Sequence, residues 1–290
     1  MTVLKTYLPG DEWLYLRIYT GYQTADNLLS DVLFPALLEA RGQNLAATWF
    51  FIRYADPDFH LRYRIRMNNG SGSSELLPKI NHDLRPWQKT GLVWKLESGT
   101  YMRETERYGI DSMAYVEQLF CTDSDVFVKF LNSGLSKTDQ DLRWLFALAS
   151  IDMLLNDFKL SISEKKELLL SLNRSFGREF GKNKFLAKQL SAKYRLQRIR
   201  IMNLLSNGMT EPDDRILDFL MERSEQSHDA INGILRLYEE DKMTVDKYDL
   251  LSSLIHMSMN RIFRNNNRMH EMVIYDLLFR HYKEIAYRVR

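Results

Sequence analysis

Cysteine is almost absent from the 290-residue chain, in which Cys121 is the only one. An intrachain disulfide and a cysteine-rich metal cluster are therefore excluded, and a reducing, cytoplasmic setting is expected. A lone cysteine is more often a core filler than a nucleophile, so we expect a structural role for Cys121.

An excess of charge of one sign is missing as well. Forty basic and 38 acidic side chains give a formal net charge of +2, which favours neither nucleic acid nor a membrane surface as a partner. The first residues lack the pattern of a signal peptide, and no apolar stretch has the length of a membrane span. The histidines other than His60 and His256 lack the spacing of a zinc site, and a Gly-rich phosphate loop is missing. We therefore expect no metal, no organic cofactor, no membrane span and no direct nucleic-acid contact.

Hydrophobic residues make up 45% of the chain, with 15 Tyr and 15 Phe, which is typical of a globular protein. The patterns predict strands over residues 13–19, 48–54, 59–66 and 92–96, and helices over residues 24–42 and 76–87. Helical periodicities dominate from residue 112, over residues 142–158, 164–176, 186–205, 245–263 and 269–287, with another helix starting at residues 211–214.

The sequence thus predicts an α+β fold, in which a small antiparallel sheet packs against a predominantly helical region. We expect one domain over residues 1–290, with the α+β part ending near residue 110 and the site in the cleft between the two parts.

The segment from His60 to Arg66 alternates strictly between basic and apolar residues. Since alternate side chains of a strand point to opposite faces, His60, Arg62, Arg64 and Arg66 share one face. A row of guanidinium groups attracts anions such as carboxylates or phosphates. An ordinary solvated face, paired with nearby acids, is the alternative reading. We expect Arg53, in the preceding strand, to join the same surface.

A second polar cluster runs from Tyr101 to Gly109. Arg103 and Arg107 are four residues apart and would share a face of a helix. Read alone, the segment favours surface ion pairs on a short helix that ends at Gly109.

A third cluster lies in the helix expected near residue 256. Here Leu251, Ile255, Met259 and Ile262 form an apolar row, while Ser252, His256 and Asn260 form a polar one. A histidine in such a helix is more often a core residue than a catalyst, yet its near-neutral pKa makes His256 the first candidate for proton transfer.

These three segments, residues 50–64, 101–109 and 256–263, resemble in order the conserved blocks of the C-terminal domain of lantibiotic dehydratases. This family is also called the thiopeptide-type bacteriocin biosynthesis domain. The helix with Glu117 after the second block, and Glu271 after the third, extend the resemblance, which covers the chain from about residue 12 to its end.

The resemblance implies glutamate elimination from glutamylated Ser or Thr of a ribosomal precursor peptide, which leaves dehydroalanine or dehydrobutyrine. A free-standing chain of this kind needs a separate glutamylating partner that uses glutamyl-tRNA. The implied catalytic residues are Arg62, Arg64, His256 and either Arg103 or Arg107, between which the alignment does not choose. We expect substrate binding by Arg53, His60, Arg66, Asn260 and Arg261.

Two positions depart from the family pattern: Ser258 stands where a second histidine is frequent, and Ile110 replaces a glycine. Two other functions stay open. One is the [4+2] cycloaddition that forms a pyridine in thiopeptide pathways, and the other is a non-catalytic subunit that binds the precursor peptide.

Overall fold

The computed structural model describes residues 4–68, 72–135, 141–206 and 214–288. The chain forms two compact units, of which the first comprises residues 1–134 and 232–246, and the second residues 135–231 and 247–290. The long helix α5 (Met113–Asn132) packs on the sheet and belongs to the first unit.

The sheet of the first unit has four antiparallel strands in the order β3-β4-β2-β5. Their bounds are β2 (Trp13–Thr20), β3 (Ala46–Tyr54), β4 (His60–Met67) and β5 (Val93–Ser98). A separate two-stranded sheet pairs β1 (Thr6–Tyr7) with β6 (Tyr101–Met102). All four predicted strands are therefore confirmed, including the hairpin of β3 and β4.

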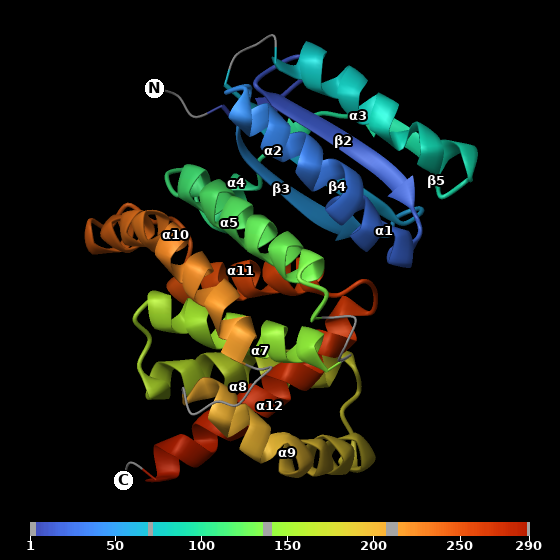
Figure 1. The fold of residues 1–290 in the computed structure, drawn as a ribbon. Helices are drawn as coiled ribbons and strands as arrows, with labels where there is room; N and C mark the ends of the chain where they lie inside the picture. The colour runs from blue at the N-terminus through green and yellow to red at the C-terminus, as the bar shows by residue number, and fades with distance from the viewer. Residues whose placement is uncertain (1–3, 69–71, 136–140, 207–213, 289–290) are drawn as a thin grey trace. The chain divides into compact units, whose positions relative to one another are not determined.

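One face of the four-stranded sheet is apolar and carries Leu61, Tyr63 and Ile65 of β4, all fully buried. The consecutive segments α1 (Tyr22–Leu28), η1 (Leu29–Leu33) and α2 (Phe34–Gly42) cover this face. The Tyr63 hydroxyl donates a hydrogen bond to the carbonyl of Leu33 at 2.8 Å, and the rings of Phe34 and Trp49 lie 5.8 Å apart. The helix α3 (Gly72–Lys89) packs on β5 and α2 (Figure 1).

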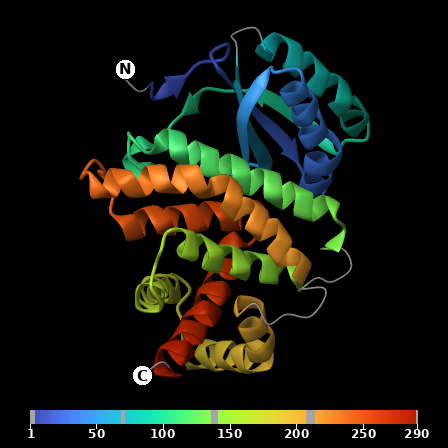
Figure 2. The same ribbon diagram turned by 60° about the vertical axis from the view of Figure 1, so that its left-hand side comes forward.

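The edge strand β3 is covered by α5 (Figure 2), and side chains of α5 contact both faces of the sheet. Phe127 lies 6.2 Å from Phe51 on one face, and Phe120 lies 5.3 Å from Phe50 on the other. This packing protects an edge that would otherwise expose unpaired backbone groups. Cys121 of α5 is buried. Its burial, together with nearby Asp125, raises the pKa of the thiol to about 11, which is in line with a structural role in the core.

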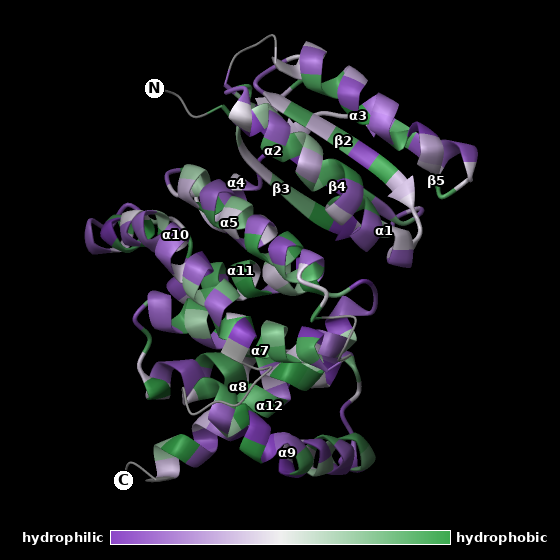
Figure 3. Cartoon of the chain, in the orientation of Figure 1, coloured by the Kyte–Doolittle hydropathy of each residue, from purple (hydrophilic) through white to green (hydrophobic). Residues whose placement is uncertain are grey.

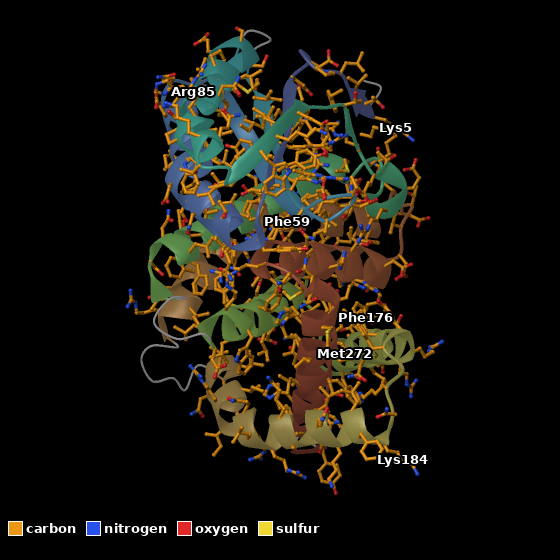
Figure 4. All side chains as sticks on the ribbon, turned by 90° about the vertical axis from the view of Figure 1, so that its right-hand side faces the viewer. Lys5, Phe59, Arg85, Phe176, Lys184 and Met272 are labelled. Atoms are coloured by element: carbon orange, nitrogen blue, oxygen red, sulfur yellow. The ribbon has the colours of Figure 1, made fainter. Side chains whose placement is uncertain are left out.

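The second unit is built from helices, with α8 packed along α12. The helices are α7 (Leu142–Asp157), α8 (Ile162–Glu179), α9 (Lys184–Leu205), α10 (Asp214–Glu239), α11 (Lys247–Ile262) and α12 (Asn267–Arg288), of which α10 contributes residues to both units. Phe176 of α8 and Met272 of α12 are both buried (Figure 4). The predicted start of a helix at residues 211–213 lies outside the described residues. Among the described helices, none has the length and apolar character that crossing a membrane requires.

Candidate functional site

The basic residues of β4 lie on the sheet face opposite the apolar one, as the alternation predicts. Arg62 is paired in register with Arg17 of β2, and Arg64 with Tyr15, while Arg17 is paired on its other side with Glu97 of β5. We call this the arginine face, defined by Tyr15, Arg17, Tyr19, His60, Arg62, Arg64, Lys95 and Glu97. Glu97 is the only acidic residue in the four strands, so the face carries a clear excess of positive charge.

Arg64 is buried among aromatic rings, with an exposed fraction of 7%. Its guanidinium carbon lies 4.6 Å from the ring centroid of Tyr15, 4.9 Å from that of Tyr101 and 5.2 Å from that of Phe50. Its Nε has no hydrogen-bond partner within the described part of the chain. Burial lowers the pKa of Arg64 from its ordinary value. Aromatic faces stabilise the cation but leave its N–H donors unused, which suits a site that receives an anion.

Arg62 stacks on Tyr54, with its guanidinium carbon 3.4 Å from the ring centroid. Its Nε donates to Nε2 of His60 at 3.4 Å, and Nδ1 of His60 lies 2.8 Å from the carbonyl oxygen of Asp58. The carbonyl requires a proton on Nδ1, so Nε2 is the acceptor and His60 is neutral. Burial lowers the pKa of His60, and the charges of Arg62 and Arg17 act in the same direction.

Glu97 collects polar contacts from three residues of the arginine face. Lys95 forms an ion pair with it at 2.7 Å, the Tyr19 hydroxyl donates to it at 2.9 Å, and Arg17 lies 3.7 Å away. Nε of Arg17 also donates to the Tyr15 hydroxyl at 3.2 Å. One carboxylate thus neutralises part of the charge of Arg17 and Lys95 and leaves Arg62 and Arg64 to other anions.

Two basic residues expected on this surface have other surroundings. Arg66 is exposed and pairs with Glu12 at 3.3 Å, as an ordinary solvated residue does. The expectation that Arg53 joins the arginine face is wrong, because Arg53 is paired with Leu61 in the register and points to the apolar face. There it is buried and forms an ion pair with Asp26 of α1 at 2.6 Å.

Arg103 does not lie in a helix, because its backbone N–H donates to the carbonyl of Lys5 and α4 spans only Thr105–Tyr108. Arg103 and Arg107 therefore do not share a helical face, contrary to the prediction. Arg103 forms a bidentate pair with Glu117, with Nε–Oε1 at 2.7 Å and Nη2–Oε2 at 2.6 Å. Burial opposes the charge of Arg103, but the hydrogen bonds and charge of Glu117 outweigh it and raise its pKa.

Arg107 differs from Arg103 in its surroundings. Its side chain is 36% exposed and forms a longer ion pair with Glu104, at 3.4 Å. A bidentate, buried pair fixes both partners, whereas an exposed pair is weak and is easily exchanged for a ligand. The geometry therefore favours Arg107 over Arg103 as an arginine available to a substrate.

His256 of α11 forms a dyad with Glu271 of α12. Nδ1 of His256 lies 2.9 Å from Oε1 and 3.1 Å from Oε2 of the carboxylate. Glu271 is fully buried, whereas the histidine side chain is 29% exposed. Tyr275, one turn further along α12, donates its hydroxyl to Glu271 at 3.0 Å. The carboxylate thus holds the proton on Nδ1 and leaves Nε2 as the basic nitrogen of the imidazole.

Two other polar residues of α11, Ser258 and Arg261, are buried. Arg261 is 1% exposed, and this burial speaks against direct contact with a substrate. Ser258, which replaces the frequent histidine, is buried with its hydroxyl 3.4 Å from that of Ser150. Asn260 is partly exposed and lies beside Asn267. His256 is thus the residue of this row that combines exposure with a buried carboxylate partner.

Acidic, histidine and cysteine side chains do not gather into a group suited to a metal ion within the described residues. The guanidinium, imidazole and carboxylate groups of the two clusters can support anion binding on the arginine face and proton transfer at the dyad.

A family model described as the C-terminal part of lantibiotic biosynthesis dehydratases matches residues 13–282. The chain belongs to this family. It is 24% identical to the nisin biosynthesis protein NisB of Lactococcus lactis subsp. lactis over 274 residues. This aligned region covers 93% of the chain and 25% of NisB. The subtilin biosynthesis protein SpaB of Bacillus subtilis is 25% identical over 274 residues, covering 92% of the chain and 25% of SpaB. The chain thus spans a quarter of the length of these relatives.

Two solved structures have a fold similar to that of this chain. The tRNA-dependent lantibiotic dehydratase MibB of Microbispora sp. 107891 superposes with a TM-score of 0.73 at 24% identity, covering 97% of the chain and 29% of MibB. TbtD, a pyridine synthase from thiomuracin biosynthesis, gives 0.72 at 13% identity, covering 97% of the chain and all of TbtD. At such identities the likeness shows the fold alone, and it confirms the predicted α+β class.

Three residues of the arginine face and the dyad were not among the residues predicted for the site. Arg17 and Glu97 belong to the arginine face, but the sequence-based prediction of that face considered only the alternation within β4. The alternation of Tyr15, Arg17 and Tyr19 with Leu14, Leu16 and Ile18 is a signal that points to Arg17. Glu271 was noted only as part of the resemblance, because fifteen residues and a turn separate it from His256.

Proposed function

We propose that this member of the lantibiotic dehydratase C-terminal family eliminates glutamate from glutamylated Ser or Thr of a precursor peptide. The proposal is supported by two observations, one from each unit of the chain. The first is a buried arginine, Arg64, with unused donors beside Arg62. The second is a histidine, His256, that a buried carboxylate orients through Nδ1.

In the proposed reaction, Nε2 of His256 removes the α-proton of the glutamylated residue. The electron pair of the broken C–H bond forms the Cα–Cβ double bond, and the Cβ–O bond breaks, so that glutamate departs as a carboxylate. Negative charge develops on the peptide carbonyl oxygen and on the leaving group. Guanidinium groups bind such oxygens in bidentate geometry, the role proposed for Arg62, Arg64 and Arg107.

Secondary roles follow from the same reading. His60 would position the substrate on the arginine face, Arg66 would do so beside that face, and Asn260 would do so near the dyad. Arg103 would act indirectly, because Glu117 holds it in place. The partners proposed are the precursor peptide and a separate protein that attaches glutamate from glutamyl-tRNA, and the proposed setting is cytoplasmic.

The test is mass spectrometry of a precursor peptide that carries a glutamyl ester on Ser or Thr, incubated with the full chain. Loss of glutamate to a dehydrated residue is expected, and it should vanish in Arg64→Met and His256→Asn. Matched controls are Arg85→Ala in α3, an exposed arginine (Figure 4), and His82→Asn, whose side chain is 82% exposed. A glutamyl adduct that persists with the unaltered protein would overturn the proposal.

The [4+2] cycloaddition is the second candidate, because TbtD, a pyridine synthase, shares the fold of this chain with a TM-score of 0.72. A peptide with two dehydroalanines distinguishes the reactions, because cycloaddition yields a pyridine and releases the leader peptide. A third candidate, a non-catalytic peptide-binding subunit, predicts that His256→Asn changes neither product.

A further inference from the structure

Helix α9 of the second unit exposes a row of large apolar side chains. Phe185, Leu196 and Ile199 have exposed fractions of 80%, 81% and 70%, and Ala192 between them is exposed as well. Figure 3 shows hydrophobic residues interleaved with hydrophilic ones along this helix. Single exposed apolar residues are common, but a row of them on one helix marks a surface for interaction.

The helix is fixed in place by its opposite side, so the exposed row is not a product of fraying. Leu190, Tyr194, Ile201 and Leu204 are buried on that side, where α9 packs against α12 and α7. Arg198 and the Tyr194 hydroxyl both bind Glu284 of α12, the latter at 2.9 Å. Asn183 caps the start of the helix through the backbone N–H groups of Phe185 and Leu186.

The spacing within the exposed row is that of a helix–helix seam. Ala192, Leu196 and Ile199 follow Phe185 after seven, four and three residues, which repeats the average period of 3.5 residues found in coiled coils. These apolar side chains form a single narrow line along the helix. A helix that lies in a membrane surface presents a broader apolar face.

The charged side chains of α9 are all positive. Helix α9 holds six Lys and Arg residues and no acidic residue, and Lys184 stands at its exposed start (Figure 4). Lys188 and Arg195 flank one side of the row, and no ion pair to either is found among the described residues. On the other side, Arg200 pairs with Asp141 at 3.7 Å.

We propose that this surface of α9, formed by Phe185, Lys188, Ala192, Arg195, Leu196 and Ile199, binds an amphipathic helix of a partner protein. The partner's apolar row would pack on Ala192, Leu196 and Ile199, and acidic residues beside that row would pair with Lys188 and Arg195. A second copy of this chain is a poor occupant, because two such helices would bring like charges together. Nucleic acid is also a poor fit, since apolar side chains occupy the centre of the surface, where phosphates would need cations.

The proposal is tested with two designed helical peptides that have leucine at the seam positions. One peptide carries Glu beside the seam and the other carries Lys at the same positions. Fluorescence anisotropy with the full chain should show that the Glu peptide binds at least about tenfold more tightly, and that its affinity falls as salt is added. Equal affinities, or no binding of the Glu peptide up to about 1 mM, would overturn the proposal.

Variants separate the two contributions. Leu196→Glu/Ile199→Glu should abolish binding of the Glu peptide, whereas Lys188→Glu/Arg195→Glu should reverse the preference and bind the Lys peptide. This reversal cannot come from misfolding, because it is a gain of binding. Phosphatidylserine vesicles and total tRNA are the remaining probes. Retention of the chain by either one, without binding of the Glu peptide, would assign the surface to lipid or RNA and sink the proposal. The substituted residues lie outside the proposed catalytic groups, so failure here leaves glutamate elimination untouched.

Discussion

Nδ1 of His256 lies 2.9 Å from Oε1 of Glu271, a carboxylate with no exposed side-chain surface. A buried carboxylate on one nitrogen fixes the tautomer of an imidazole and stabilises the imidazolium that forms when the other nitrogen takes up a proton. Because Tyr275 donates to the same carboxylate, the orientation of Glu271 is fixed in turn. The dyad therefore has the parts that a general base requires.

Glu271→Gln should lower kcat for glutamate elimination by about 100-fold or more, because an amide can still hold Nδ1–H but does not stabilise the imidazolium. KM should change little, since Glu271 is buried and does not contact substrate. Steady-state kinetics by mass spectrometry give both constants. Glu167→Gln, at an exposed position of α8, is the control. Unchanged kcat in Glu271→Gln would show that the dyad is structural.

The aromatic surroundings of Arg64 lead to a second prediction. A buried cation that lacks a carboxylate partner is costly, and an apolar side chain of similar volume removes the cost. Arg64→Met should therefore unfold at the same or a higher urea concentration than the unaltered protein, yet lose glutamate elimination. The comparison is Arg53→Met, which removes the buried ion pair with Asp26 and should lose about 3 kcal/mol or more of unfolding free energy. Strong destabilisation by Arg64→Met would contradict this account.

Arg103 and Arg107 should respond in opposite ways to substitution by alanine. Arg103→Ala strands the buried carboxylate of Glu117 and should cost about 3 to 5 kcal/mol of unfolding free energy. Arg107→Ala removes an exposed pair and should change stability by less than about 1 kcal/mol while it lowers elimination. Urea unfolding combined with the elimination assay checks both. Full activity in Arg107→Ala would exclude it as a catalytic arginine.

The sequence carried the two faces of β4, because alternation along a strand depends on neighbouring residues alone. The position of Arg53 was missed for a geometric reason. The hairpin pairs Tyr54 with His60, and a shift of one residue in that register moves every side chain of β3 to the other face. The length of the turn therefore decides where Arg53 points, and the composition of residues 55–59 does not determine that length.

The segment around Arg103 shows a second limit. The spacing of Arg103 and Arg107 suits a helix, yet a pair with Glu117, fourteen residues away, and a backbone bond to Lys5 hold Arg103 in an extended segment. Contacts between distant segments outweigh local propensity here. The dyad shows the reverse case. Family resemblance pointed to both His256 and Glu271, but their contact depends on the packing of α11 on α12, which the sequence does not show.

The neutral state of His60 predicts how stability depends on pH. Burial and the charges of Arg62 and Arg17 lower the pKa of His60 in the folded chain, so the unfolded chain binds this proton at higher pH. Stability from the neutral histidine is then fully present above the ordinary pKa of about 6.5 and is lost as the pH falls towards the folded value. His60→Gln should shrink the difference in urea-unfolding free energy between about pH 7.5 and about pH 5.5, whereas the exposed His82→Asn should not.

His270 and His281, whose pKa values burial also lowers, keep part of the dependence in both variants. An identical pH dependence in His60→Gln and the unaltered protein would mean that His60 is already charged, and its contact with Nε of Arg62 would then need another explanation.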